Sequence, residues 1–315
     1  MEQVDNAHSP EPTPAATQEF FSKALAARTS ASDIDIDGSN VAYWCYEPVT
    51  VTPATRTILV IHGFRGDHHG LLRVVDHLPE MRVIMPDLPG FGSSEPFAGD
   101  PHTVERYGKF ITGFMAALEL APETVLLGHS FGSIIASHFA AANPRAVRPL
   151  ILVNPIAAPA LEGPKGLMTK LAVLYYRISA KLPRRIGLAV LRNRLIVRLM
   201  STAMAKTKDK ALRAFVHGQH DAYFSAFADR SSLLESFQAS VSSNVGEVAG
   251  QLDLPVLLVA GEKDEIALLR DQRKLLDMLP DGTLEVIPDV GHLIHYETPA
   301  PAAAAIRSFL EEHPA

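Results

Sequence analysis

The sequence has a single cysteine, Cys45, among its 315 residues. One thiol cannot form an intramolecular disulfide, and it cannot supply the ligands of a Cys/His zinc finger or an iron–sulfur cluster. Because lone thiols are usual in reducing compartments, we expect a cytoplasmic protein.

Long apolar runs and an export signal are also missing. The first 20 residues contain no basic segment followed by an apolar one, so they do not read as a secretory signal. The longest uncharged stretch, residues 124–144, contains two glycines and two histidines and fits strand, turn and helix better than a membrane span. The sequence therefore predicts a soluble protein.

Excess positive charge is absent from the chain as a whole, whose net charge is −6. This balance argues against a general nucleic-acid-binding protein. The charge is unevenly distributed, because residues 161–213 carry 13 Lys and Arg against Glu162 and Asp209, a net charge of +11 that leaves −17 on the rest. A basic segment in an acidic body is a clue to partners.

Short β-branched runs alternate with longer helical patterns along most of the chain. Residues 33–37 and 41–46 flank a Gly-Ser-Asn turn and predict an N-terminal hairpin. Residues 57–61 (TILVI) form an apolar run typical of a buried parallel strand. The alternation predicts an α/β fold with a mostly parallel central sheet and helices on both faces. Further strands are expected at 83–85, 125–127, 150–153, 256–260 and 284–287, and helices at 104–120, 131–142, 267–279 and 301–312.

Residues 159–250 interrupt this alternation because they contain no strand-like run. Apolar side chains recur there at helical spacing, at Leu171, Leu174, Tyr175 and Ile178 and again at Leu188, Leu191, Leu195 and Leu199. We therefore expect a mobile tail (1–16), a core (17–158 and 251–315) and an inserted helical cap (159–250). The apolar faces of the cap helices are expected to cover the carboxyl ends of the strands, where open α/β sheets bind ligands.

The strongest chemical signal is the segment GHSFG at residues 128–132. It follows an apolar run and precedes a helical pattern, so Ser130 is expected on a tight, strained turn between strand and helix. A serine hydroxyl is a weak nucleophile that needs a base, and the base needs an orienting group. Downstream, three acidic residues, Glu262, Asp264 and Glu265, follow one late strand-like run, and His292 follows the last one, which gives the order serine, acid, histidine.

From about residue 33 to 313 the chain resembles the α/β-hydrolase superfamily, as a serine hydrolase with a helical cap. The resemblance rests on HGF at 62–64, DLPGFGS at 87–93, GHSFG at 128–132, GEKD at 261–264 and GH at 291–292. It implies Ser130 as nucleophile, His292 as general base and Asp264 as the residue that orients His292. It also implies that the backbone N–H groups of Phe64 and Phe131 form the oxyanion hole.

Several neighbouring residues compete for these roles. Glu262 is the next candidate for the acid, and His295 follows His292 by three residues, where it is expected to pack against the last helix. His62 and His129 are expected to support their loops. Adjacent His68 and His69 beside Asp67 do not predict a metal site, because neighbouring histidines cannot easily face one ion. No metal and no cofactor are expected.

Substrate contacts are less well specified, with Arg65, His129, Tyr175 and Phe224 as candidates. Arg65 is expected either to meet an acidic substrate group or to be a solvated surface residue. The basic cap allows three interpretations, namely a solvated helix surface, peripheral contact with an anionic membrane, or attraction of an anionic substrate.

These features predict a serine hydrolase that cleaves a carboxylic ester with an apolar acyl group through an acyl-enzyme on Ser130. The substrate is expected to be a small-molecule or lipid ester. The alternatives are a carbon–carbon bond hydrolase, a thioesterase, an acyltransferase, or a non-catalytic binding or regulatory protein on the same scaffold.

Overall fold

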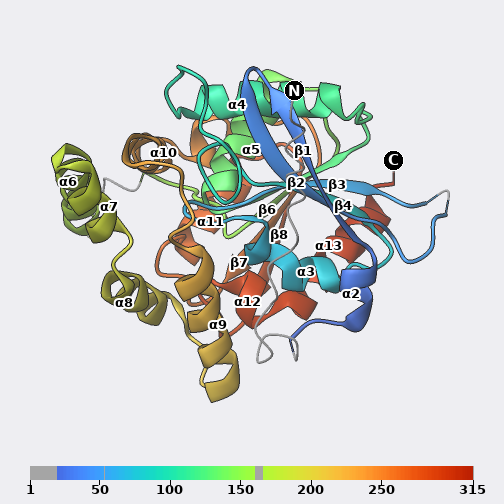
Figure 1. Cartoon of the computed structure of the whole chain (residues 1–315). Helices are drawn as coiled ribbons and strands as arrows, with labels where there is room; N and C mark the ends of the chain where they lie inside the picture. Colours follow the sequence, from blue (N-terminus) through green and yellow to red (C-terminus); the bar gives the residue numbers. More distant parts are fainter. Residues whose placement is uncertain (1–19, 53, 160–165, 315) are drawn as a thin grey trace.

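The computed structural model describes residues 20–52, 54–159 and 166–314 (Figure 1). The expected tail, residues 1–16, lies outside the described residues. Within them, no helix has the length and apolar character needed to cross a bilayer.

In the described residues, eight strands form one sheet in the order β1-β2-β4-β3-β5-β6-β7-β8. Strands β3 to β8 run parallel to one another, whereas β2 is antiparallel to both β1 and β4. The predicted mostly parallel sheet is therefore confirmed. The strands are β1 (Thr29–Ile36), β2 (Ser39–Tyr46), β3 (Thr57–Ile61), β4 (Arg82–Pro86), β5 (Val125–His129), β6 (Leu150–Val153), β7 (Val256–Gly261) and β8 (Gly282–Ile287).

The predicted N-terminal hairpin is present, but its turn lies one residue earlier than expected. The loop between β1 and β2 consists of Asp37 and Gly38, with φ angles of 54° and 79°. Two-residue hairpin loops favour Asp-Gly because both positions need positive φ. Ser39, expected in the turn, instead begins β2.

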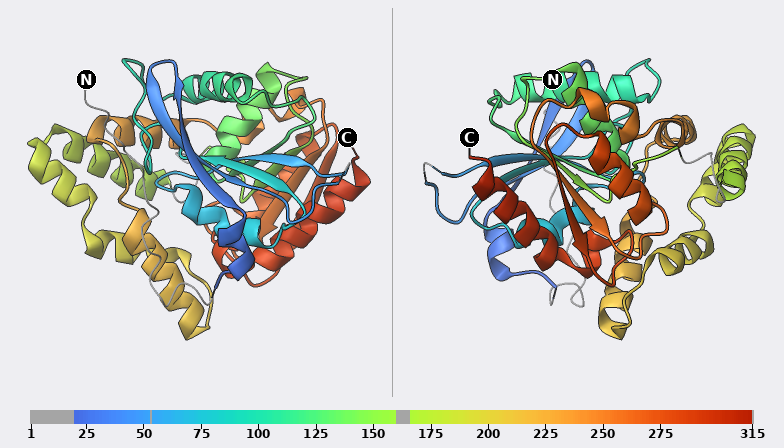
Figure 2. Two further views of the ribbon diagram at one scale, coloured as in Figure 1. Left: turned by 45° about the vertical axis from the view of Figure 1, so that its right-hand side comes forward. Right: turned by 180° about the vertical axis from the view of Figure 1, so that it is seen from behind.

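Helices cover both faces of the sheet (Figures 1 and 2). Leu59 and Ile61 of β3 point to the layer of α4, α5 and α11, whereas Ile58 and Val60 point to the layer of α3 and α13. This alternation buries β3 on both sides and explains its continuous apolar run. The covering helices are α2 (Lys23–Ala27), α3 (Leu72–Asp76), α4 (Val104–Ala117), α5 (Phe131–Ala142), α11 (Leu269–Met278), α12 (Ile294–Glu297) and α13 (Pro299–Glu312), with the 3₁₀ helix η1 (His68–Leu71).

Among the described residues, five α-helices lie between β6 and β7, and α6, α7 and α8 project to one side of the molecule (Figures 1 and 2). As expected, the described residues between β6 and β7 contain no strand of the sheet. The inserted helices are α6 (Gly166–Lys181), α7 (Arg184–Leu191), α8 (Arg194–Met204), α9 (Lys210–Tyr223) and α10 (Arg230–Ser242), followed by the short 3₁₀ helices η2 (Val245–Glu247) and η3 (Ala249–Gln251).

The expected orientation of the apolar faces is wrong for α6 and α8. Leu171, Leu174 and Ile178 of α6 are half exposed, and Leu195 and Leu199 of α8 are 80% and 71% exposed. Each helix instead packs through other residues, which are Tyr176 and Ser179 in α6 and Val197 and Ser201 in α8. Helical spacing identifies a face, but it cannot tell whether that face meets protein or the outside.

Candidate active site

Ser130 lies at the sharp turn between β5 and α5. Its φ and ψ angles are 52° and −115°, in the strained region that non-glycine residues rarely adopt. The flanking glycines permit the turn, because a Cβ on Gly128 would lie 2.4 Å from the carbonyl oxygen of Gly132. A Cβ on Gly132 would lie 2.1 Å from the carbonyl oxygen of Ile61. The turn thus presents the Ser130 hydroxyl at the carboxyl edge of the sheet.

The structure brings Ser130, His292 and Asp264 into one hydrogen-bonded chain. The Ser130 Oγ lies 2.8 Å from the His292 Nε2, and the His292 Nδ1 lies 2.8 Å from the Asp264 Oδ2. The acid and histidine loops pack tightly, because a Cβ on Gly261 would lie 2.4 Å from the carbonyl oxygen of Gly291. An imidazole in this position can accept the hydroxyl proton while the carboxylate fixes its tautomer.

Asp264 is buried and accepts hydrogen bonds at both carboxylate oxygens. Its Oδ1 accepts the backbone N–H groups of Ile266 and Ala267 at 2.7 and 2.9 Å. Burial alone would raise the pKa of this carboxyl, but attraction to His292 and these hydrogen bonds offset burial and lower the pKa. Asp264 is therefore held as a carboxylate beside the imidazole.

The competing candidates lie elsewhere. Glu262 accepts the backbone N–H of Asp289 at 3.0 Å, and Glu265 forms an ion pair with Lys206. His295 is buried, and its ring lies 4.2 Å from that of His129 rather than against the serine. Among the candidates, His292 and Asp264 are therefore the pair that reaches Ser130.

Asn154 is a site residue that the sequence analysis missed. It is fully buried directly after β6, and its Nδ2 donates to the Asp264 Oδ2 at 2.9 Å and to the Gly291 carbonyl at 3.3 Å. It therefore ties the acid loop to the histidine loop. The sequence does contain a signal for Asn154, because this residue directly follows a buried strand. That strand, β6, lies between β5, which ends before Ser130, and β7, which ends before Asp264.

We expect Asn154→Ala to lower kcat about tenfold to a hundredfold, because it removes a hydrogen bond to a buried charged group. KM should change little, and the pH profile of kcat should shift, because Asn154 acts through Asp264 rather than on substrate. Steady-state kinetics across pH measure both effects. Asn244→Ala removes a similar amide, bonded to Glu247 at 2.8 Å away from the site, and should leave kcat within twofold. Equal losses in both variants would contradict a positioning role.

The loop after β3 lies against the serine. A Cβ on Gly63 would lie 3.2 Å from the Ser130 Cβ, so the chain passes directly over the turn that holds Ser130. In the described part of the chain, no acceptor is found for the backbone N–H of Phe64 or Phe131. Two free N–H groups beside a serine hydroxyl can stabilise a developing oxyanion.

His62 and His129 buttress this loop. The His62 Nε2 accepts the backbone N–H of Leu88 at 2.8 Å, and its Nδ1 contacts the Gly63 carbonyl at 2.8 Å. This pattern assigns the proton to Nδ1, and burial lowers the His62 pKa, so the ring is neutral. The His129 Nδ1 would lie 3.0 Å from a Cβ on Gly63, so its ring supports the same loop.

The expectation of a solvated Arg65 is wrong. The side chain is 1% exposed and donates to the Phe224 carbonyl at 2.9 Å, the Leu191 carbonyl at 2.8 Å and the Tyr176 hydroxyl at 3.3 Å. Arg65 therefore joins the Phe64 loop to three parts of the insertion.

Phe224 lies at this junction, with its ring 5.4 Å from the Arg65 guanidinium. Tyr175, in contrast, faces α7 and donates to the Val190 carbonyl.

Buried histidines make stability depend on pH. Burial lowers the pKa of His102 to about 4 and those of His129 and His220 to about 3. The unfolded chain binds protons at these residues near pH 6.5, whereas the folded chain does not. Below pH 6.5, each histidine therefore reduces the free energy of unfolding by about 1.4 kcal/mol per pH unit until its folded pKa is reached.

We expect the free energy of unfolding to fall by several kcal/mol between pH 7.5 and pH 5. Urea unfolding followed by circular dichroism at both pH values measures this. The His102→Gln variant serves as comparison and should lose less stability on acidification than the wild type. Unchanged or greater stability at pH 5 would contradict the neutral state of these histidines.

Asp67, His68 and His69 offer three ligand atoms within 4.8 Å of one another. One ring nitrogen of each histidine already has a partner, because the His68 Nδ1 lies 2.9 Å from Asp87 and the His69 Nδ1 lies 3.2 Å from Asp67. The His68 ring also stacks on Trp44. These contacts explain the cluster as a hydrogen-bonded support for the loop, and they add no observation that points to an ion.

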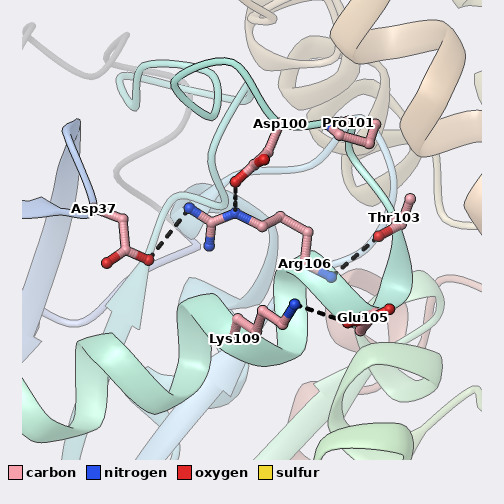
Figure 3. A pocket seen from close by; sticks show the side chains of 7 residues that line it. All are labelled: Asp37, Asp100, Pro101, Thr103, Glu105, Arg106 and Lys109. Carbon is pink, nitrogen blue, oxygen red and sulfur yellow. Dashed lines mark hydrogen bonds and ion pairs between the residues drawn. The ribbon is translucent and has the colours of Figure 1, made fainter.

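A surface cavity of about 420 Å³ lies away from Ser130, beside the start of α4 (Figure 3). Arg106 in its wall pairs with Asp100 at 2.8 Å and Asp37 at 3.3 Å, and Lys109 pairs with Glu105 at 2.8 Å. The wall is therefore lined by ion-paired charged groups, and among the described residues the buried Arg106 Nη1 has no hydrogen-bond partner. The cavity therefore does not match the apolar ester expected from the sequence.

Comparison with known proteins agrees with this architecture. A family model described as the alpha/beta hydrolase fold matches residues 56–299. Lipase 3 of a Moraxella species is 25% identical over 301 residues, covering 91% of this chain and 88% of that protein. A thermophilic esterase from Thermogutta terrifontis matches with a TM-score of 0.69 at 22% identity, covering 90% of this chain and 98% of the esterase.

An esterase from Exiguobacterium antarcticum matches with a TM-score of 0.72 at 16% identity, covering 90% of this chain and all of that chain. At such identities, the two solved structures show a shared fold and not a shared substrate. The matched residues 56–299 include the Phe64 loop and all three members of the hydrogen-bonded chain. The protein therefore belongs to the α/β-hydrolase fold family.

Proposed function

We propose that the protein is a serine hydrolase that cleaves a carboxylic ester with an apolar acyl group. The observation that carries this proposal is the chain from the Ser130 Oγ through His292 to the Asp264 carboxylate, with 2.8 Å at each step. The similarity to Lipase 3 of the Moraxella species, which covers 91% of this chain, supports the same chemistry.

The reaction takes place in two halves. The Ser130 Oγ attacks the ester carbonyl while the His292 Nε2 takes the hydroxyl proton, and the N–H groups of Phe64 and Phe131 stabilise the oxyanion. His292 then gives this proton to the departing alkoxide, which leaves an acyl-enzyme on Ser130. A water molecule, deprotonated by His292, attacks the acyl carbonyl and releases the acid and free Ser130.

Aromatic rings around the Phe64 loop favour an apolar substrate. The Phe64 ring centroid lies 5.8 Å from that of Tyr176 in α6 and 5.4 Å from that of Phe237 in α10. We propose that residues 159–250 act as a cap over a core formed by residues 17–158 and 251–315. The rings contributed by this cap, including that of Phe224, would contact the acyl group, while Arg65 ties the cap to the Phe64 loop.

A substrate panel tests this proposal. Wild-type protein should hydrolyse p-nitrophenyl esters, with higher kcat/KM for medium or long acyl chains than for acetate. Ser130→Ala should lower kcat by about ten-thousand-fold or more. A preference for thioesters would instead indicate a thioesterase. Carbon–carbon cleavage of a diketone would indicate a carbon–carbon bond hydrolase, and transfer to an added alcohol would indicate an acyltransferase. Lack of activity on the whole panel would favour a binding protein.

A further inference from the structure

Three consecutive helices of the insertion expose large aliphatic side chains. Within the described residues, ten large apolar side chains are 48% exposed or more, and six of them lie on α6, α7 and α8. The six are Leu171, Leu174, Ile178, Ile186, Leu195 and Leu199. Apolar side chains gathered on one segment, rather than scattered singly, indicate a contact surface.

The exposed residues form ordered stripes. In α6, Leu171, Leu174 and Ile178 recur at spacings of three and four, so they share one side of the helix. In α8, Leu195 and Leu199 lie opposite the buried Val197 and Ser201, so this stripe faces directly outward. These three helices also project beside the sheet, away from its covering helices (Figures 1 and 2).

Positive charge accompanies these stripes. Residues 166–204 contain eight Lys and Arg and no Asp or Glu. On the helical wheel of α6, Lys170, Arg177 and Lys181 line one edge of the leucine stripe. The basic residues of this segment are Lys170, Arg177, Lys181, Arg184, Arg185, Arg192, Arg194 and Arg198.

Few carboxylates from neighbouring elements offset this charge. Asp221 of α9 pairs with Arg198, while Asp229 and Glu235 border a cavity of about 310 Å³ that Arg184 also lines. In the part of the chain that the structure describes, Arg185 and Arg194 have no carboxylate within ion-pair distance. The segment therefore keeps most of its positive charge exposed.

We propose that α6, α7 and α8 dock the protein onto an anionic phospholipid bilayer. Such a surface offers phosphate and carboxylate groups to the Lys and Arg side chains and an acyl boundary to the Leu and Ile side chains. A nucleic acid would satisfy the charges but leave the aliphatic stripes in water. Docking does not require the proposed hydrolysis, so it is measurable on Ser130→Ala as well as on the wild type.

Cosedimentation with lipid vesicles tests the docking. Wild-type protein should bind vesicles of equal parts phosphatidylglycerol and phosphatidylcholine at least tenfold more tightly than vesicles of phosphatidylcholine alone. Raising the salt from about 50 to about 500 mM should weaken this binding several-fold, because exposed charges are screened. Equal binding to both vesicles, or no binding, would overturn the proposal.

Two double variants separate the contribution of the aliphatic side chains to vesicle binding from that of the positive charges. The double variants Leu195→Gln/Leu199→Gln and Arg185→Gln/Arg194→Gln should each weaken binding at least tenfold, because they alter the surface without touching Ser130. The matched control Val49→Gln/Val51→Gln changes two side chains that are 65% and 77% exposed and lie outside α6, α7 and α8. This control should bind vesicles within twofold of the wild type. An equal loss in the control would overturn the proposal.

Light scattering of the same proteins tests whether a second copy of this chain, rather than a bilayer, covers α6, α7 and α8. A wild-type dimer that becomes monomeric in Leu195→Gln/Leu199→Gln, with unchanged vesicle binding, would show that a second copy covers these helices and would overturn the proposal. Monomers throughout, with vesicle binding lost only in the surface variants, would support it.

Discussion

Replacing His292 by alanine is expected to lower kcat for a p-nitrophenyl ester by about a hundred-thousand-fold. The His292 Nε2, 2.8 Å from the Ser130 Oγ, is the group that can take the hydroxyl proton. Without it, the serine stays protonated at neutral pH and is a weak nucleophile. Steady-state hydrolysis, with protein concentrations high enough to detect the residual rate, measures the effect.

The His295→Gln variant controls for the loss of a buried imidazole. His295 is close in the sequence and buried, but its ring packs on His129 and Tyr296. We expect kcat to fall less than tenfold in this variant, with some loss of thermal stability. If His295→Gln removed activity and His292→Ala did not, the assignment of the base would be wrong.

Replacing Asp264 by asparagine should lower kcat about ten-thousand-fold. An amide that donates toward the His292 Nδ1 would leave the ring proton on Nε2, directed at Ser130, so the imidazole could no longer accept the hydroxyl proton. Asparagine nearly matches aspartate in volume, so the fold should survive. Kinetics together with a thermal melt separate the catalytic loss from any loss of folded protein.

The neighbouring acids provide matched controls for this variant. Glu262→Gln and Glu265→Gln remove carboxylates within two residues of Asp264, but these carboxylates contact Asp289 and Lys206 on the surface. Both variants should retain kcat within about threefold, as surface substitutions usually have small effects. A large loss in Glu262→Gln with little loss in Asp264→Asn would contradict the account.

Much of the fold could be predicted from the sequence because the strongest sequence signals are local. An apolar run that ends in GHSFG requires a strand, a tight turn and a helix in succession, and the strain at Ser130 follows from that turn. The alternation of apolar runs with helical patterns likewise implied a parallel sheet whose carboxyl edge gathers the loops. The proposed roles of Asp264 and His292 depended on that shared edge.

Features that depend on long-range packing could not be predicted in the same way. Asn154 matters because β6 lies between β5 and β7, which brings it to Asp264 across 110 residues. The burial of Arg65 requires the insertion to fold back over the Phe64 loop. The exposed stripe at Leu171 and Leu174 shows the same limit, since periodicity carries no information about what faces a helix.

Labelling with a fluorophosphonate followed by peptide mass spectrometry tests the central claim most directly. We expect one adduct on the folded wild-type protein, on the Ser130 Oγ, and none on His292→Ala or on heat-denatured protein. Ser201 is a stringent internal comparison, because its Oγ lies 2.6 and 2.7 Å from the Nδ1 atoms of His217 and His220. An adduct on Ser201, or none on folded protein, would contradict the claim that Ser130 is the activated nucleophile.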